Sequence, residues 1–265
     1  NDRPGFGTLA EAMSGFVHVN GYPDREPLLP PTGLADGIAG VFGALGVLAA
    51  LIGRPHAEAG GQYIDTSLLE PIFTLLGPHS LEYQHLEKVP ERTGNRSTSS
   101  APRNIYETGD GQYVAIAASV QELAMRVFEA IGRPELQDDP RFEDNESRLE
   151  NVEILDEIIQ DWMAQHSRRE IIQRFEDAEA TIGPIYDIED IIDDEHYRAR
   201  NALVEVPDDA LGSGIVHNVF PRLNRTPGRI SHLGPELGSH NKEVYRDWLE
   251  YDVKTVNELR EAGVI

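Results

Sequence analysis

The chain has 265 residues, of which 46 are acidic and 23 basic, giving a formal net charge of −23 at pH 7. This balance argues against nucleic acid as a partner, because phosphate backbones are bound by basic surfaces. The absence of cysteine excludes disulfides, thiolate metal sites and a cysteine nucleophile. A chain of this length can bury one large core or two ordinary ones.

The acidic side chains are spread along the whole chain, and the basic set consists of 20 Arg and only three Lys. An excess of Asp and Glu with little Lys resembles proteins from salt-loving organisms. Their dense surface charge keeps them hydrated, and salt screens the repulsion. We therefore expect a halophilic protein.

The chain opens with Asn1 in place of a methionine, and a short helical pattern over 9–13 follows at once. We expect the chain to begin within the fold. Residues 20–35 are rich in Pro, Gly and charge, which predicts a loop that leads to Asp36.

The central stretch runs from Thr32 to Gly53. Its apolar residues recur at i, i+3, i+4 and i+7, which predicts one buried helical face made of Ile38, Val41, Phe42, Leu45, Leu48, Ala49 and Ile52. Gly53, followed by Pro55, marks the end of this helix. Asp36 falls at or near its start, where unpaired amides and the helix dipole favour an anion. On this pattern alone, Asp36 is either a functional carboxylate or simply a helix cap.

The glycines of this helix carry two interpretations. Gly40 and Gly43 are predicted to lie below Asp36 and to leave space beside its carboxylate. Alternatively, they let another element pack closely.

We expect no membrane span, because the central helix is judged too short and too rich in glycine to cross a bilayer. No secretory signal pattern opens the sequence. The default expectation is a soluble, cytoplasmic protein without a membrane partner.

The rest of the chain alternates helices and short strands. Residues 60–65 predict a strand, followed by a helix that Asp65 or Thr66 caps and that runs to Leu76. After a polar loop over 88–104, Asp110-Gly111 predicts a hairpin turn between two strands. Further helices are expected at 120–131, 146–164, 168–178, 241–249 and 253–261, two acidic helical turns within 183–200, and strands at 202–206 and 215–219.

Taken together, several stretches resemble the family III CoA transferases, the group of formyl-CoA transferase and carnitine CoA-transferase. They keep their order and spacing almost from end to end. The family chain is longer at its N-terminus, so an early nucleotide-binding segment is expected to be missing. The matching stretches are Arg3-Pro-Gly-Phe-Gly7, Ala10-Glu-Ala-Met-Ser-Gly15, Gly33-Leu-Ala-Asp36, Gly61-Gln-Tyr-Ile-Asp-Thr-Ser-Leu-Leu69, Gly94-Asn95, Ala101-Pro102, Tyr106-Glu-Thr-Gly-Asp-Gly111, Asp139-Pro-Arg-Phe142, Gly183-Pro-Ile185, Thr226-Pro-Gly228 and Leu237-Gly-Ser-His240.

The resemblance implies an α/β fold with a large Rossmann-like domain, a smaller α+β domain and an interlocked homodimer. Residues 1–87 would belong to the large domain, 88–100 would form a linker, and 101–200 would form the small domain. Residues 201–265 would return to the large domain.

The resemblance also assigns a site. Asp36 matches the family's catalytic nucleophile, and the residues expected at coenzyme A are Arg3, Gly5, Phe6, Gly7, Gly33 and Gly37. Small residues near Asp36 (Gly33, Gly37, Gly40) would leave room for the pantetheine thiol, or serve only close helix packing. The family's Lys and Glu are replaced here by Pro4 and Gly7, so Arg3 either supplies the lost positive charge or is a plain surface residue. The nine His residues show no metal-ligand spacing, and no metal is expected.

The loop Gly94 to Ser100 corresponds to a glycine-rich flap in some family members. Here Ser and Thr replace most of those glycines, so an ordinary connecting loop is the alternative.

The implied activity is transfer of CoA from an acyl-CoA to a small carboxylic acid through an aspartyl anhydride and an aspartyl-CoA thioester. The main alternative is a racemase of 2-methyl-branched acyl-CoA. That reaction needs a second base, and the matching segment Gly5-Phe6-Gly7-Thr8 holds no His. His18 is the only His before Asp36 and lies beyond the match. A non-catalytic partner subunit is a third possibility.

The net charge leads to a prediction about stability. At 0.01 M salt the Debye length is about 30 Å, so the net charge of −23 repels itself across the molecule. We expect Tm to rise by about 5 °C or more between 0.01 M and 1 M KCl. Differential scanning fluorimetry at fixed pH measures this, and a flat response would contradict the halophilic interpretation.

Overall fold

The computed structural model describes residues 4–54 and 60–265, and the chain divides into two compact units that meet between Ile185 and Tyr186. Both units mix helices with strands, so the predicted mixed α/β class is confirmed. The domain boundaries and the interlocked dimer stay predictions.

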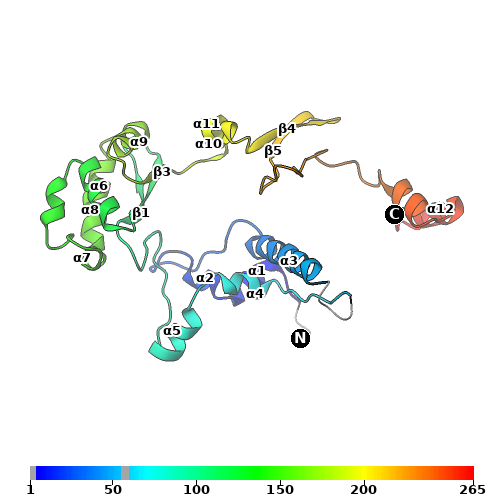
Figure 1. Cartoon of the computed structure of the whole chain (residues 1–265), viewed down its shortest axis with the longest axis horizontal. Coiled ribbons are helices and arrows are strands. Elements are labelled where there is room, and N and C mark those ends of the chain that lie inside the picture. Colours follow the sequence, from blue (N-terminus) through cyan, green and yellow to red (C-terminus); the bar gives the residue numbers. More distant parts are fainter. Residues whose placement is uncertain (1–3, 55–59) are drawn as a thin grey trace. The chain divides into compact units, whose positions relative to one another are not determined.

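The first unit begins with a group of helices. They are α1 (Gly7–Met13), α2 (Phe16–Val19), α3 (Leu34–Gly53), α4 (Leu69–Thr74) and α5 (His79–Leu86). Helices α1, α3 and α4 contact one another (Figure 1). Their contact is built on small side chains of α3, Ala35 and Ala39, together with Ile72 of α4, all buried. Alanines let the neighbouring helices approach α3 closely near its start.

The predicted buried face of α3 is wrong for the elements that the structure describes. Val41, Leu45 and Ile52 are 69%, 59% and 77% exposed, and Phe42 and Leu48 are exposed as well. Helices α1 and α4 pack against the alanines, which lie on another side of α3. The apolar stripe therefore has no cover from the described residues.

The expectation that this helix is too short to cross a bilayer is also wrong. Helix α3 has 20 residues, and its most apolar stretch of 18 residues has a mean hydropathy of 2.0, with 11% of that stretch buried. Among the described residues, it is the one helix long and apolar enough to cross a membrane. Length and composition alone are weak evidence for a membrane span, because core helices of soluble proteins meet the same criteria.

The segment after residue 60 differs from its prediction. No strand forms over 60–65, since no described strand pairs with it. The hydroxyl of Ser67, and not Asp65 or Thr66, accepts the Glu70 N–H at 3.1 Å. The predicted helix to Leu76 ends at Thr74, and Gly77 adopts a positive φ of 73° before α5 begins. Such a left-handed residue ends a helix, and glycine adopts it without strain.

A compact body follows within the same unit. Its antiparallel sheet has the order β1 (Arg103–Glu107), β2 (Tyr113–Ala117), β3 (Ile182–Pro184). The predicted hairpin is confirmed, with Tyr106 opposite Val114. The Asp110 carboxylate in its turn accepts the Thr108 hydroxyl, which lowers the pKa of Asp110. The helices of this body are α6 (Gln121–Ala130), η2 (Pro134–Asp138), α7 (Asn145–Glu150), α8 (Val152–Met163) and α9 (Arg168–Asp177).

The predicted helix 146–164 is thus divided into α7 and α8. The division lies at Asn151, where the backbone leaves helical geometry (φ −110°, ψ 24°) and the side chain donates to the Ser147 carbonyl at 2.9 Å. Asparagine competes for backbone hydrogen bonds in this way, and so interrupts helices.

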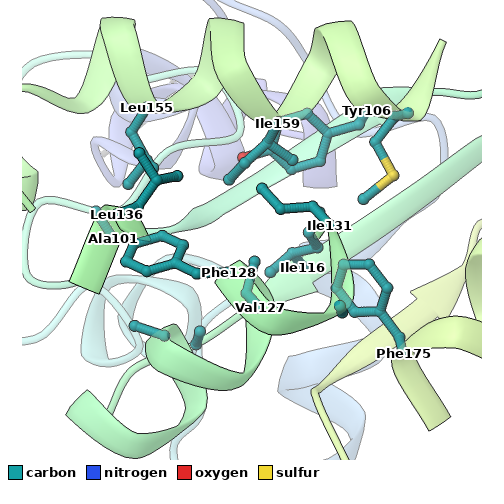
Figure 2. Packing of buried hydrophobic residues seen from close by; sticks show 14 of the residues in the cluster. Ala101, Tyr106, Ile116, Val127, Phe128, Ile131, Leu136, Leu155, Ile159 and Phe175 are labelled. Atoms are coloured by element: carbon teal, nitrogen blue, oxygen red, sulfur yellow. The ribbon is translucent and has the colours of Figure 1, made fainter. Parts of the chain in front are cut away.

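The core of this body lies between the sheet and helices α6, α8 and α9. Figure 2 shows Leu155 and Ile159 of α8 pointing toward Phe128 and Ile131. Phe175 of α9 closes the cluster near Ile116 of the sheet. All of these side chains are buried, and such continuous apolar burial is the main source of folding free energy.

A buried carboxylate joins the segment before β1 to α8. Asp156 is 7% exposed and accepts three hydrogen bonds, from Arg96 Nε at 2.7 Å, Asn104 Nδ2 at 2.8 Å and the Tyr106 hydroxyl at 2.7 Å. Burial, followed by the Asp156 charge, raises the pKa of Tyr106, so its phenol stays protonated as the donor. This network satisfies a charge that would otherwise be costly to bury.

The loop expected to act as a flap or a linker is held on both sides. Arg92 donates to the carbonyls of Tyr22 (3.1 Å) and His18 (3.0 Å), and the Gly94 N–H donates to the Gly21 carbonyl at 2.9 Å. Two residues further on, Arg96 reaches Asp156. These contacts favour a fixed connection over a mobile flap for residues 92–96.

The second unit contains four helical elements and one hairpin. The hairpin pairs β4 (Leu203–Asp208) with β5 (Gly212–His217), close to the predicted strands. Helices α10 (Ile188–Asp193) and α11 (Glu195–Ala199) are the two predicted acidic turns, capped by the carboxylates of Asp187 and Asp194. The π-helical turn η3 (Lys242–Trp248) and α12 (Val253–Glu261) follow, also as predicted.

The Asp156 network leads to a stability prediction. We expect Asp156→Ala to lower the free energy of unfolding by about 2–4 kcal/mol, because it leaves the Tyr106 hydroxyl and the Arg96 guanidinium without their acceptor. Tyr106→Phe removes a single donor and should cost only about 1 kcal/mol. Urea unfolding followed by circular dichroism measures both, and equal losses would contradict a shared network.

Candidate active site at the start of helix α3

Asp36 lies in the first turn of α3, as the sequence predicts. Gly33 is the N-cap, so Asp36 is the third residue of the helix, and its side chain is exposed. The Asp36 N–H has no hydrogen-bond partner in the described part of the chain. This position lies at the positive end of the dipole of a 20-residue helix, which attracts negative charge.

Two glycines border the Asp36 carboxylate. A methyl group placed on Gly7 would overlap Asp36 Oδ2 and come within 2.8 Å of Asp36 Cγ, and one on Gly33 would lie 3.1 Å from Oδ2. Gly7 is the first residue of α1 and is buried, so the carboxylate rests against the start of that helix. The absent side chains of Gly7 and Gly33 are therefore what gives the carboxylate its place.

The other glycines expected beside Asp36 lie elsewhere. A methyl group on Gly37, Gly40 or Gly43 would meet nothing within 4 Å. The prediction that Gly40 and Gly43 make space beside the carboxylate is wrong, because helical geometry places them on an open side of α3.

A buried glutamate of α1 accepts a hydrogen bond from the first turn of α3. Glu11 of α1 is 2% exposed, and its Oε1 accepts the Ala35 N–H at 3.1 Å. Gly33 has no side chain to cap the helix, so α1 supplies the acceptor that a capping residue normally provides. Glu11 lies four residues after Gly7, on the same face of α1.

An apolar cavity opens beside this end of α3. It measures about 480 Å³ and is lined by Thr32, Gly33, Leu34, Gly37, Ile38, Val41, Phe42 and Leu75. Gly33 is common to the cavity and to the surroundings of Asp36. The two glycines predicted for coenzyme A in this segment, Gly33 and Gly37, both line it.

The remaining predicted coenzyme A residues divide by position. Arg3 lies outside the described residues. Gly5 meets nothing within 4 Å where a side chain would stand, and Phe6 is the 82% exposed N-cap of α1. Of the predicted residues at this end of the chain, Gly7 is the one that borders the Asp36 carboxylate in the described structure.

Glu11 is the site residue that sequence reasoning missed. A usable signal exists, because Glu11 is acidic in a short helical pattern otherwise made of Leu, Ala and Met. Only the fold, however, shows that this pattern packs against the start of the Asp36 helix.

His18 belongs to α2, and its carbonyl accepts from Arg92, as described above. Within residues 4–54 and 60–265, no group of three His, Cys, Asp or Glu side chains is arranged to hold a metal ion.

The chain belongs to the CoA-transferase family III, whose model matches residues 1–241. The fold agrees, since a CaiB/BaiF family protein from Brucella suis has a crystal structure that superposes with a TM-score of 0.77 at 25% identity. That likeness covers 93% of this chain and 63% of the other.

Two relatives whose names state an activity come from Chloroflexus aurantiacus. The succinyl-CoA–L-malate CoA-transferase alpha subunit is 36% identical over 99% of this chain and 61% of its own length. The succinyl-CoA–D-citramalate CoA-transferase is 36% identical over 94% of this chain and 61% of its own length. The chain thus spans about three-fifths of the length of these relatives.

The contact at Gly7 leads to a structural prediction. In Gly7→Ala the new methyl group occupies the place of Asp36 Oδ2, so we expect the carboxylate to rotate away. The fold should lose no more than about 1 kcal/mol, because the atoms that must move end an exposed side chain. A crystal structure of the variant measures the Asp36 χ1 angle.

The matched control is Gly40→Ala, which adds the same methyl group within α3 where nothing lies within 4 Å. It should leave Asp36 in place and stabilise the helix by about 1 kcal/mol. An unmoved Asp36 carboxylate in Gly7→Ala would contradict the assigned contact.

Proposed function

We propose that the protein transfers coenzyme A from an acyl-CoA to a small carboxylic acid, with Asp36 as the nucleophile. The observation that carries the proposal is the Asp36 carboxylate itself, exposed in the first turn of α3 and bordered by two glycines. Membership of the CoA-transferase family III supports it.

The first half of the reaction acylates Asp36. Its carboxylate attacks the thioester carbonyl of the donor, the C–S bond breaks, and a mixed anhydride and a CoA thiolate form. The thiolate then attacks the aspartyl carbonyl, the anhydride C–O bond breaks, and the donor acid leaves. Asp36 now carries CoA as a thioester.

The second half runs the same steps in reverse. The acceptor carboxylate attacks the aspartyl thioester, the CoA thiolate leaves, and a new anhydride forms. The thiolate attacks the acceptor's acyl carbon, which gives the product thioester and restores the Asp36 carboxylate. No net proton is transferred, so the chemistry requires neither a general base nor a metal.

The surroundings of Asp36 suit this sequence of steps. A carboxylate is a weak nucleophile, so much of the acceleration must come from its orientation. The absence of side chains at Gly7 and Gly33 makes room for the carboxylate, and because Asp36 is exposed a reacting carbonyl can reach it. The Asp36 N–H, which has no partner among the described residues, and the positive end of the α3 dipole can stabilise negative charge that develops there.

The apolar cavity beside Gly33 and Gly37 suits the pantetheine arm. That arm is long, flexible and largely uncharged, and the cavity is lined mainly by aliphatic and aromatic carbon. The names of the relatives, which act on succinyl-CoA with malate or citramalate, further suggest dicarboxylic acids as the substrate class.

The racemase alternative finds no support at the site. Proton exchange at the α-carbon needs two bases that face one another. Beside Asp36, the described structure offers glycines, an apolar cavity and the buried Glu11, whose carboxylate is engaged by the Ala35 N–H.

The decisive test is Asp36→Asn. We expect transfer activity to fall by about three orders of magnitude or more, because an amide forms neither the anhydride nor the thioester. The free energy of unfolding should change by about 1 kcal/mol or less, the usual value of a helix-dipole contact. Steady-state kinetics and urea unfolding measure the two effects.

Mass spectrometry identifies the intermediate. The wild-type protein quenched with its acyl-CoA should show a CoA-sized addition on the peptide that contains Asp36, and hydroxylamine should trap the same residue. Asp65→Asn, which neutralises another exposed carboxylate nearby in sequence, should retain activity. Transfer that survives in Asp36→Asn would place the nucleophile elsewhere. Exchange of the α-proton without CoA transfer would favour the racemase.

A further inference from the structure

Glu11 is unusual because it is a carboxylate buried in a small helical contact without a basic partner. It is 2% exposed, and no Lys, Arg or His pairs with it in the described part of the chain. Burying such a group is unfavourable unless hydrogen bonds compensate for the lost water. Its side chain accepts one protein hydrogen bond there, from the Ala35 N–H at 3.1 Å.

That hydrogen bond connects the two helices that meet at the candidate nucleophile. Ala35 is the residue before Asp36, and Gly7, whose missing side chain makes room for the Asp36 carboxylate, lies one turn before Glu11 in α1. The Glu11 hydrogen bond therefore adds a directional contact to the apolar packing between α1 and α3, at the residue next to Asp36.

The backbone hydrogen bonds of this turn stay within the α3 segment, while Ala35 and Ala39 supply its apolar packing. The Leu34 N–H donates to the Thr32 carbonyl and the Gly37 N–H donates to the Gly33 carbonyl, both within the same segment. Gly33, as the N-cap, offers no side chain. Within the described residues, the hydrogen bond to Glu11 is the one that joins this turn to α1.

We propose that Glu11 is a positioning residue for the transfer reaction, which acts by accepting the Ala35 N–H and so holding the Asp36 carboxylate over Gly7. The inference rests on the proposed function of Asp36. It assigns Glu11 no contact with substrate and no proton transfer. What it requires of Glu11 is a buried acceptor oxygen within hydrogen-bond distance of the Ala35 N–H of α3.

The proposal requires an acceptor oxygen at residue 11 and no negative charge, so it predicts different effects for Glu11→Gln and Glu11→Ala. Glu11→Gln keeps an acceptor oxygen at the same reach, so kcat should stay within about threefold of wild type. Glu11→Ala removes the acceptor, and a displacement of about 1 Å can cost about 100-fold in rate. We expect kcat of Glu11→Ala to fall by about 10- to 100-fold while KM for acyl-CoA changes by less than about threefold.

Two further variants guard against a trivial loss of folding. Glu11→Asp withdraws the oxygen by one methylene and should lower kcat about tenfold, even if Glu11→Ala fails to fold. Ser14→Ala is the matched control, because Ser14 is buried in the same region but makes no hydrogen bond to the Glu11 carboxylate: its hydroxyl donates to the Glu11 carbonyl at 2.9 Å and accepts the Phe16 N–H at 3.2 Å. Its kcat should match that of the wild type.

The experiment is carried out on the full chain well below Tm, with kcat normalised to the fraction of protein that accepts CoA on Asp36. A role in stability alone would lower that fraction or Tm and leave the normalised kcat unchanged, which would overturn the proposal. A Glu11→Gln variant as slow as Glu11→Ala would also overturn it, since the charge would then be the requirement.

A second readout is independent of catalysis. Hydrogen exchange of the Ala35 amide should accelerate about tenfold or more in Glu11→Ala and remain near wild type in Glu11→Gln. Unchanged exchange in Glu11→Ala would refute the hydrogen bond, whatever the activity. If wild-type protein transfers no CoA although this exchange pattern holds, the proposed function fails and the contact between α1 and α3 stands.

Discussion

The position of Asp36 depends on where α3 begins and on what lies against its first turn. Gly33 begins the helix without a capping side chain, and Glu11 provides the missing acceptor from α1. Helix α1 also places Gly7 against the Asp36 carboxylate. The contact between α1 and α3 therefore sets the position and the direction of this carboxylate. Residues 7–36 therefore contain the hydrogen bond and the close approach that border the Asp36 carboxylate.

The loop that contains the predicted flap, residues 94–100, is a second segment held by hydrogen bonds. Arg92 and Gly94 hold it to the turn that follows α2, and Arg96 holds it to Asp156 beneath the small sheet. A residue with a side chain would be strained at position 94, because the φ of Gly94 is +62° and a methyl group there would come within 2.7 Å of the Tyr22 ring. This glycine thus serves packing, whereas a flap glycine serves motion. Residues 92–96 connect the helices around Asp36 to the body that contains Asp156.

Sequence reasoning succeeded where local signals decide the structure. Asp110-Gly111 specifies a hairpin, and the helical period over 168–178 specifies α9, which a Ser167 capping box confirms. It failed where a contact with another segment of the chain decides the structure. Residues 60–65 have strand propensity but no described strand to pair with, and the apolar stripe of α3 meets the criterion for a buried face although α1 and α4 pack on its alanines. Glu11 was missed for the same reason, because its role exists only once α1 and α3 are in contact.

Gly7 gives the departure from the family pattern a physical meaning. The family resemblance implies Glu at this position, and here a side chain would overlap Asp36 Oδ2. In this chain the carboxylate of Asp36 itself occupies the volume that such a side chain would need, while the acidic group of α1, Glu11, is buried one turn further along the helix. A glutamate at position 7 would displace the Asp36 carboxylate and add a second negative charge beside it. Glu11 is instead buried, and it contributes its hydrogen bond to the turn that carries Asp36.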